Sequence, residues 1–425
     1  MAKGFEEVRQ LFSREECAQL CVYVGGELVV DLWKGHPSCP EYSKNTLTNI
    51  FSSGKSLTSL AFAMMEDRGH IKYTARLVEY WPEFCGLGRE GISVADLLRH
   101  EAGFANQPQG LDSLEDLLPE NILQNSVGKL YTLSEAPGPR WPAKGKREYH
   151  PISRGLIANE VFRRVHPRGL TMGQFLREEL VDKLDLRVFV GCREEEMEDF
   201  QPVRMASGVL APLRGARGIS YRDFPSFFYE CYWTRMEFLV AGSPVDYMAV
   251  NSDGFRKGEL VSGCGNANAA SLAILASHLA CGGGPLLSLR ACQAMHSDVT
   301  SAGLLGEKAY THFSQGGLNL YRSSDFFCHG REGFWGWQGF GGSVFQWHPE
   351  LQIGFAFVPS VLELDLTNQR AGLLQETVVR CVRERARRMA EAEEGLAREE
   401  EEEEEEARRR EERREEGRGW FPWFI

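Results

Sequence analysis

Two short β-rich runs open the chain. Apolar and β-branched residues dominate 19–24 and 27–33, and Gly25-Gly26 separates the two runs. Two such runs joined by two glycines are typical of a hairpin with a tight turn. A second pair, 342–347 and 351–358, lies near the far end of the chain. The pattern therefore predicts antiparallel strands at both ends of the globular part.

Between these hairpins the apolar pattern is mostly helical. One helix face is marked by residues at i, i+3, i+4 spacing: Leu57, Leu60, Ala61, Met64 and Met65. Gly69 follows as a stop signal. A sheet built from both chain ends, with helices between, must have those helices packed on it or gathered in a lobe beside it. We therefore expect an α+β fold, with an antiparallel sheet flanked by helices and a mostly helical lobe.

The chain changes character after residue 366. A last packed helix is indicated by four apolar residues: Leu373, Leu374, Val378 and Val382. From Arg383 onward charge replaces the apolar pattern, and 399–406 is an unbroken run of eight acids followed by mixed Glu and Arg. Such a segment is either a solvated helix or a disordered tail, and neither needs a core.

We divide the chain accordingly. A β-rich and helical domain is predicted over 5–385, and a Glu/Arg-rich extension over 386–425. The extension ends in an aromatic segment, 419–425, after a long polar stretch. Exposed aromatic clusters mark docking sites, so this end is a candidate contact with a protein or a membrane surface. The alternative is that it folds back onto the domain.

Composition narrows the class of protein. Hydrophobic residues make up 43% and charged residues 25% of the 425 residues, which is ordinary for a globular chain. The net charge of −12 gives no reason to expect nucleic-acid binding, which normally shows as a basic face. No apolar run of about 18 residues occurs, and acids stand where a secretory signal would be apolar. We expect no transmembrane segment and a cytoplasmic location.

The cysteines carry no metal or disulfide signature. There are 11 of them, an odd number scattered without a dense framework, so most should be reduced thiols. Cys17 and Cys21 are four residues apart, but such a pair alone rarely makes a metal site. HExxH, paired CxxC and glycine-rich phosphate loops are absent from the sequence. We therefore predict no metal and no cofactor.

The sharpest chemical signal is 51–55, Phe-Ser-Ser-Gly-Lys, where the predicted helix begins. Ser52 and Lys55 are three residues apart, so one helical turn places both on one face. A serine at a helix N-terminus gains from the helix dipole, and its backbone N–H can bind an oxyanion. A desolvated lysine that loses its proton can accept the hydroxyl proton. Taken alone, the motif favours the simpler interpretation of an N-capping serine and a solvent-facing lysine.

Several further segments favour the catalytic interpretation of Ser52 and Lys55, because their order along the chain matches that of a known family. Between about 20 and 360 the chain resembles the serine β-lactamase-like, penicillin-recognising family, particularly its class C and esterase branches. Segment 26–33 resembles the family's opening hairpin, 50–58 its nucleophile motif, and 92–104 its LLxHxxG segment. The resemblance implies a transpeptidase-like α+β fold. It also implies a structural role for His100 rather than that of a catalytic base.

The resemblance points to a third catalytic residue. The family's second motif supplies a tyrosine, and the matching segment here makes Tyr149 the candidate partner of Ser52 and Lys55. A phenol coupled to Lys55 would pass the proton from Ser52 to the leaving group, provided that its pKa of about 10 falls or is shared. Pro151 stands where many members carry asparagine, while a Tyr-His pair resembles the esterase branch. This departure disfavours β-lactam turnover more than hydrolysis.

The family's third motif, Lys-Thr-Gly or His-x-Gly, aligns with 337–339, Trp-Gln-Gly. Trp337 thus replaces a basic residue that would hold an anionic substrate group, and indole supplies no charge. Gly339 suits a close approach of backbone to ligand, and the Phe340 N–H is expected to complete the oxyanion hole with that of Ser52.

The aromatic residues around this motif bear on the substrate. Trp335, Trp337 and Phe340 together would make the mouth of the site apolar, which suits a hydrophobic acyl chain or an aryl ester. The alternative is that some of these rings pack inward.

Two functional hypotheses follow. The first is a serine hydrolase that forms an acyl-enzyme from a small ester or amide, with apolar acyl or aryl substrates favoured over β-lactams. Its rival is a catalytically inactive relative whose fold serves binding or assembly. Trp337 favours the rival, whereas Ser52, Lys55 and Tyr149 in the expected order favour catalysis. The enzyme hypothesis requires the hydroxyl, amine and phenol of these three residues to converge.

Overall fold

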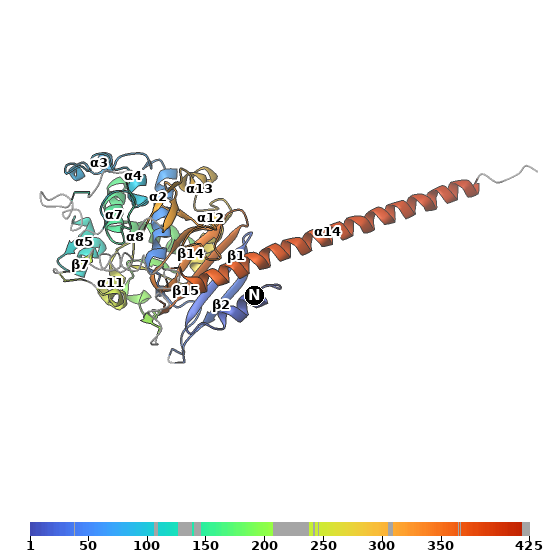
Figure 1. The fold of residues 1–425 in the computed structure, drawn as a ribbon, viewed down its shortest axis with the longest axis horizontal. Helices are drawn as coiled ribbons and strands as arrows, with labels where there is room; N and C mark the ends of the chain where they lie inside the picture. The colour runs from blue at the N-terminus through green and yellow to red at the C-terminus, as the bar shows by residue number, and fades with distance from the viewer. Residues whose placement is uncertain are drawn as a thin grey trace, which may run out of the picture. The chain divides into compact units, whose positions relative to one another are not determined.

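The largest element of the fold is an eight-stranded antiparallel sheet (Figure 1). A computed structural model describes residues 1–37, 39–105, 109–125, 138–139, 146–206, 238–240, 243–244, 246–304, 309–363, 365 and 367–418. The strands lie in the order β10-β11-β12-β13-β14-β15-β1-β2. Their bounds are β1 (Ala18–Val24), β2 (Glu27–Lys34), β10 (Thr300–Gly303), β11 (Tyr310–Phe313), β12 (Asn319–Leu320), β13 (Trp335–Gln338), β14 (Val344–His348) and β15 (Ile353–Pro359).

Both predicted hairpins are present in this sheet. Gly25 and Gly26 join β1 to β2 with φ of 58° and 83°, and positive φ at both central residues is what a tight hairpin turn of this hand requires. The two hairpins then pair with each other, because β1 runs antiparallel to β15 with Leu20 opposite Phe357. The α+β prediction, with a sheet made from both chain ends, is therefore confirmed.

The other described strands form three smaller sheets. They are β3 (Thr48–Asn49), β9 (Gly265–Ala267) and β5 (Val188–Val190); β4 (Gln109–Leu111), β7 (Phe238–Val240) and β8 (Ser243–Pro244); and β16 (Val361–Leu362) with β6 (Arg204–Met205). The first of them matters most for function, because β3 leads directly into the segment that carries Ser52.

Helices occupy the middle of the chain, as the periodicity predicts. The α-helices are α1 (Glu6–Phe12), α2 (Lys55–Asp67), α3 (Leu77–Tyr80), α4 (Val94–Leu98), α5 (Pro119–Leu123), α7 (Ser153–Val165), α8 (Met172–Leu176), α11 (Asp253–Lys257), α12 (Ala269–Ala280), α13 (Leu289–His296) and α14 (Gln369–Arg418). Shorter turns of helix are η1 (Phe51–Gly54), η2 (Pro82–Phe84), η3 (Leu114–Leu117), η4 (Arg177–Asp182), η5 (Glu194–Glu196), η6 (Tyr247–Asn251) and η7 (Phe340–Gly342).

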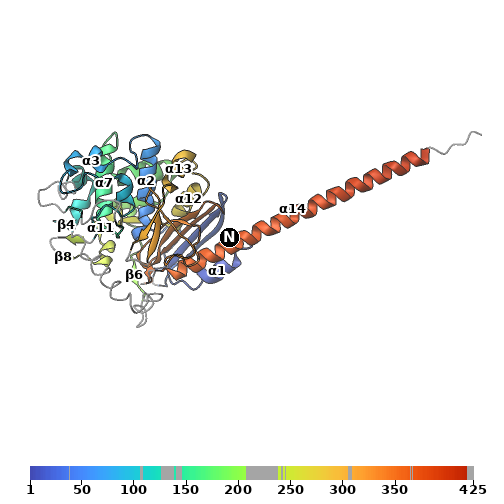
Figure 2. The same cartoon turned by 45° about the horizontal axis from the view of Figure 1, so that its top comes forward.

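Helix α2 is the central helix of the lobe. Every residue from Lys55 to Met65 is buried, whereas the spacing predicts one buried face. The difference arises because α2 packs against β13 as well as against α7, α8 and α13, so no side of it faces solvent. Helix α12 covers the sheet over β15 and β1 (Figure 2). The first residues of α2 are thereby fixed between sheet and helical lobe.

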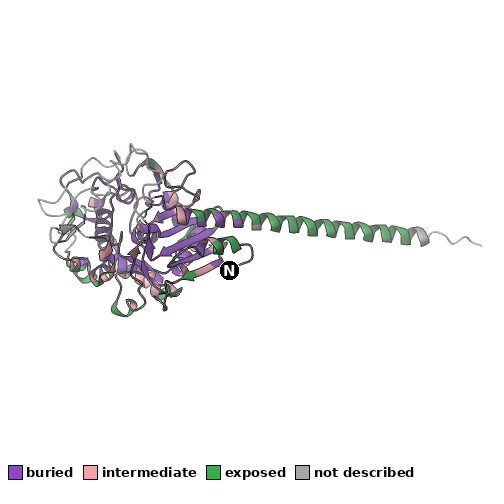
Figure 3. Cartoon of the chain, turned by 60° about the horizontal axis from the view of Figure 1, so that its bottom comes forward, coloured by how far each residue is buried: buried purple, intermediate pink, exposed green. Residues whose placement is uncertain are grey.

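The charged extension is helical. Helix α14 continues to Arg418, and its residues from Glu384 to Arg414 are nearly all exposed (Figure 3). Ion pairs at i, i+4 recur along it, among them Arg398–Glu394 and Arg409–Glu405. Each such pair contributes only about 0.3–0.5 kcal/mol, but their repetition supports a helix that has no core. The aromatic segment 419–425 lies outside the described residues.

Two compact units are distinguished by their internal contacts, Met1–Glu376 and Thr377–Ile425. The predicted domain boundary between 385 and 386 stays a prediction. The ten cysteines in the described ranges are free thiols. No helix of the described chain has both the length and the apolar character of a membrane span.

Candidate active site

Ser52 lies on a strained turn between a strand and a helix. The preceding residue, Phe51, has φ of 46°, a left-handed conformation that is uncommon for a bulky side chain and is often found at functional sites. Ser52 itself is partly exposed, whereas its neighbours Phe51, Ser53 and Gly54 are buried. The turn thus presents one hydroxyl to the surface and buries the residues around it.

Two polar side chains hold this turn in place. Asn49 accepts a hydrogen bond from the Phe51 N–H at 2.8 Å and donates its amide to the carbonyl of Gly263 at 3.0 Å. Ser343 donates to the Ile50 carbonyl at 2.7 Å and lies 3.0 Å from the Ser53 hydroxyl. These bonds connect the turn to partners more than 200 residues away in sequence. Sequence reasoning missed both residues, since nothing local distinguishes them.

Lys55 reaches back to Ser52 from the first turn of α2. Its side chain is completely buried, and its Nζ lies 3.0 Å from Ser52 Oγ, 3.3 Å from the Pro151 carbonyl and 3.1 Å from the Ser262 carbonyl. Two backbone carbonyls thus hold the amine against the Ser52 hydroxyl.

Tyr149 contacts the same hydroxyl from a different part of the chain. Its phenol oxygen lies 2.5 Å from Ser52 Oγ, and either atom can be the donor. The phenol ring also covers the amine of Lys55, whose Nζ is 5.1 Å from the ring centroid. The structure therefore brings the Ser52, Lys55 and Tyr149 side chains together around one oxygen atom, although their catalytic roles stay predictions.

Two buried histidines hold the Tyr149 segment. His100 accepts a hydrogen bond on Nδ1 from the His150 N–H at 2.9 Å, and its ring lies 5.1 Å from that of Tyr149. Burial, reinforced by nearby positive charge, holds the pKa of His100 well below its usual range, so this imidazole is a neutral acceptor. His150 Nε2 in turn accepts from the Phe104 N–H at 2.8 Å. These contacts fit the structural role expected for His100.

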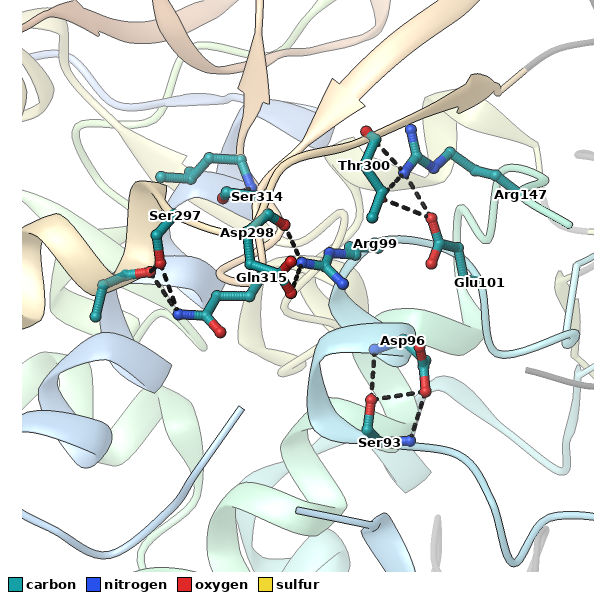
Figure 4. A network of polar contacts seen from close by, with 12 residues as sticks. Ser93, Asp96, Arg99, Glu101, Arg147, Ser297, Asp298, Thr300, Ser314 and Gln315 are labelled. Carbon is teal, nitrogen blue, oxygen red and sulfur yellow. Dashed lines mark hydrogen bonds and ion pairs between the residues drawn. The ribbon is translucent and has the colours of Figure 1, made fainter. Parts of the chain in front are cut away.

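An ion pair anchors the chain two residues before Tyr149 (Figure 4). The buried Arg147 donates to Glu101 Oε1 at 2.6 Å and to Thr300 Oγ1 at 2.5 Å, and through its other terminal nitrogen to the Thr311 carbonyl at 2.8 Å. Glu101 follows His100 directly in sequence. The same short segment thus fixes Tyr149 both through an imidazole and through a carboxylate.

Trp337 lies beneath the site rather than at its mouth. Its side chain is 5% exposed, and its indole N–H donates to the Gly317 carbonyl at 2.7 Å. The ring stacks beside Tyr149 with centroids 6.2 Å apart and lies 5.7 Å from the Lys55 amine. Trp337 therefore belongs to the inward-packing alternative, and its contribution to substrate binding stays a prediction.

Gly339 is required by the close approach of two backbones. A β-carbon at this position would collide with the Ile50 carbonyl and the Ser343 hydroxyl. The glycine therefore lets the end of β13 lie directly against the turn that carries Ser52. Phe340 follows at the surface, partly exposed, with its ring 5.5 Å from that of Phe51. This arrangement is compatible with the predicted oxyanion role of the Phe340 N–H, which stays a prediction.

Comparison with known families agrees with this geometry. The model of the Beta-lactamase family matches residues 8–375. The chain belongs to the Beta-lactamase family. A curated family relative, Esterase/beta-lactamase LipL from Mycobacterium tuberculosis (strain ATCC 25618 / H37Rv), is 32% identical over 169 residues. That match spans 39% of this chain and 37% of the relative's length.

Solved structures extend the family likeness to the whole fold. A penicillin-binding protein homologue from Caulobacter crescentus is 25% identical, with a TM-score of 0.70 over 89% of this chain and 98% of its own. A family VIII carboxylesterase is 24% identical, with a TM-score of 0.71 over 89% and 98%. EstA from Arthrobacter nitroguajacolicus Rue61a is 23% identical, with a TM-score of 0.72 over 91% and 98%. The family resemblance and the transpeptidase-like fold predicted from the sequence are confirmed.

Proposed function

We propose that this protein is a serine hydrolase that cleaves a small ester or amide through an acyl-enzyme on Ser52. One observation carries the proposal. The Ser52 hydroxyl lies within hydrogen-bond distance of both an amine that is completely buried, that of Lys55, and a phenol, that of Tyr149. A nucleophile bonded directly to its proton acceptors is the arrangement that activates a weak hydroxyl for attack on a carbonyl carbon.

The reaction divides into two balanced halves. In acylation, Ser52 Oγ bonds to the carbonyl carbon while its proton passes to the pair formed by Lys55 and Tyr149. The backbone N–H groups of Ser52 and Phe340 stabilise the oxyanion. Collapse of the tetrahedral intermediate breaks the bond to the leaving alcohol or amine, which takes up that proton. In deacylation, a water molecule gives a proton to the same pair and attacks the acyl carbon. The bond between that carbon and Ser52 Oγ then breaks, Oγ takes the proton back, and the acid is released.

The substrate class follows from what surrounds the nucleophile. By the resemblance, Trp337 stands where the family's third motif has a basic residue, so a carboxylate beside the scissile bond gains no partner there. Phe340 offers an apolar, partly exposed ring next to the nucleophile turn. We therefore favour apolar acyl or aryl esters over β-lactams. The names of the similar proteins, an esterase/β-lactamase and a carboxylesterase, support ester cleavage as such.

The test is intact-protein mass spectrometry after incubation with a fluorophosphonate probe, together with turnover of a short-chain aryl ester. Wild type is compared with Ser52→Ala, and Ser53→Ala serves as the matched control on the same turn. We expect a single adduct and ester turnover in wild type and in the control, and neither in Ser52→Ala.

The rival function is a binding or assembly role without catalysis, which the replacement of a basic residue by Trp337 favours. It predicts that folded wild type forms no adduct and turns over no ester. A folded wild type that stays unlabelled would therefore replace our proposal with this one.

A further inference from the structure

Arg154 is a buried cation that the proposed mechanism does not use. It is the second residue of α7, and no part of its side chain is exposed. Its Nε donates to the Leu98 carbonyl at 3.1 Å. Neither Nη1 nor Nη2 has a hydrogen-bond partner within the described part of the chain. Terminal guanidinium nitrogens buried without a partner are expensive, so the position needs an explanation.

The guanidinium lies against the indole that stands beneath the active site. Arg154 Cζ is 5.7 Å from the ring centroid of Trp337. A β-carbon at Gly317 would lie 2.9 Å from Arg154 Nη2, and the Gly317 carbonyl is the one that accepts the indole N–H. The ring of Tyr149 stacks beside the same indole. Trp337 therefore contacts a phenol and a buried cation at once.

The charge of Arg154 also interacts with the phenol of Tyr149. Burial lowers the pKa of Arg154 to about 9, and interaction with Tyr149 acts in the opposite direction. Within the described residues, no carboxylate acts on Arg154 in this way. A cation whose acidic neighbour is a phenol favours the phenolate form of that neighbour. Because Arg154 is completely buried, it cannot instead meet an anionic group of the substrate.

We propose that Arg154 replaces, from beneath the site, the cation that Trp337 has displaced from the third motif, and that it stabilises negative charge on Tyr149 during proton transfer. This inference rests on the proposed function. It makes Arg154 a positioning residue that acts through Tyr149 and does not touch the substrate. With tryptophan at 337, the substrate side of the site has no cation to bind an anionic group. Arg154 still supplies a positive charge near the phenol of Tyr149.

Other charged groups around Tyr149 do not supply the same effect. The neighbouring titratable and charged groups are Lys55 from α2, His100 and Glu101 after α4, and Arg147, Glu148 and His150 on its own segment. His100 is neutral because its pKa is held well below the usual range. Arg147 is paired with Glu101 at 2.6 Å. In the proposed mechanism Lys55 exchanges the proton itself, which leaves Arg154, among the described residues, as the cation that keeps its charge and has no carboxylate partner.

The experiment measures kcat/KM for a short-chain aryl ester, and the rate of fluorophosphonate labelling, across a pH range. Arg154→Met should shift the rising limb of both pH profiles to higher pH by about one unit, which is a loss of about tenfold at a given pH on that limb. At high pH the variant and the wild type should reach the same values. Arg154→Lys retains the charge and should leave the limb in place. Arg163→Met on the same helix is the control, because Glu160 keeps its second partner Arg164.

A second arm tests whether the effect passes through the phenol. In a Tyr149→Phe background, Arg154→Met should cost less than about twofold, because the two changes remove one interaction. A uniform loss at every pH, or full additivity with Tyr149→Phe, would show a structural role and overturn the proposal. Failure of both Arg154→Met and Arg154→Gln to fold would overturn it too, since the fold itself would then need the charge. Absence of any Ser52-dependent labelling in wild type would instead refute the proposed function.

Discussion

Ser52 and Ser301 each lie in a three-membered side-chain network, and the two networks differ in almost everything else. Ser52 contacts Lys55 and Tyr149 at 3.0 and 2.5 Å. Ser301, on an edge strand of the large sheet, lies 2.7 Å from His312 Nδ1, and His312 Nε2 lies 3.0 Å from Asp325. By residue type, the second network resembles the better-known catalytic triad more closely.

The backbone separates the two cases. Ser301 is in the middle of β10, directly opposite His312 on β11. In a strand the side chain stands perpendicular to the sheet while the N–H lies in its plane, so the hydroxyl and the N–H of Ser301 point in different directions. Ser52 instead follows the strained Phe51 and precedes α2, where hydroxyl and N–H can face one carbonyl group. Connectivity of side chains alone therefore does not make a nucleophile.

The largest expected difference is between the two serine variants. Ser52→Ala should lower ester turnover by about 10³-fold or more, because the nucleophile is lost and only binding and oxyanion contacts remain. Ser301→Ala should change kcat/KM by less than about twofold, as expected where no reacting group is removed. Steady-state kinetics of both purified variants checks this, with circular dichroism confirming that each is folded. Comparable losses in both variants would break the comparison.

The next effect concerns the proton acceptors. Tyr149→Phe should lower kcat by about 10²- to 10⁴-fold, the usual size of a general acid–base contribution, and leave KM nearly unchanged. His312→Gln, the matching change in the other network, should leave both constants within about twofold of wild type, because no proton transfer depends on it. Activity retained in Tyr149→Phe would show that Lys55 acts alone.

A smaller effect is expected from the residue that holds the strained turn. Asn49→Ala removes the acceptor of the Phe51 N–H and should lower kcat by about tenfold, since a small misplacement of the nucleophile is costly. It should also destabilise the fold by about 1–3 kcal/mol, because a buried donor loses its partner. Kinetics and denaturant unfolding of one preparation measure both. An unchanged kcat would mean that the turn keeps its shape without this contact.

The smallest effect on turnover is predicted for the carboxylate of the second network. Asp325→Asn should cost about 1.5–3 kcal/mol of unfolding free energy, the usual contribution of a hydrogen bond to a charged group, without any change in turnover. Urea unfolding and ester kinetics together decide it. A fall in turnover would show that the Ser301 network contributes to catalysis after all.

The sequence predicts the parts of this site that are local. Gly25-Gly26 specifies a hairpin, and the apolar periodicity from Leu57 specifies a helix that begins where Ser52 lies. Only the family resemblance indicates Tyr149, since no spacing rule connects it to Ser52, 97 residues earlier in the chain. These predictions rest on propensity and pattern within short windows.

The parts that sequence could not supply depend on packing between distant segments. Trp337 turns inward because Gly317 offers its carbonyl to the indole N–H. Arg154 lies near the site because α7 begins beside that indole. Ser343 contacts the turn that carries Ser52 because β14 begins there. The sequence does not decide the form of the charged extension either, since i, i+4 ion pairs favour a helix while its composition favours disorder.

The most direct test of the account is to locate the fluorophosphonate on wild-type protein by peptide mapping with tandem mass spectrometry. The account predicts a single modified peptide whose phosphonate is on Ser52, with the peptide that carries Ser301 unmodified. A phosphonate on Ser301, or on both serines at similar occupancy, would contradict the claim that the strained turn and its amine–phenol pair, rather than a hydrogen-bonded network alone, create the nucleophile.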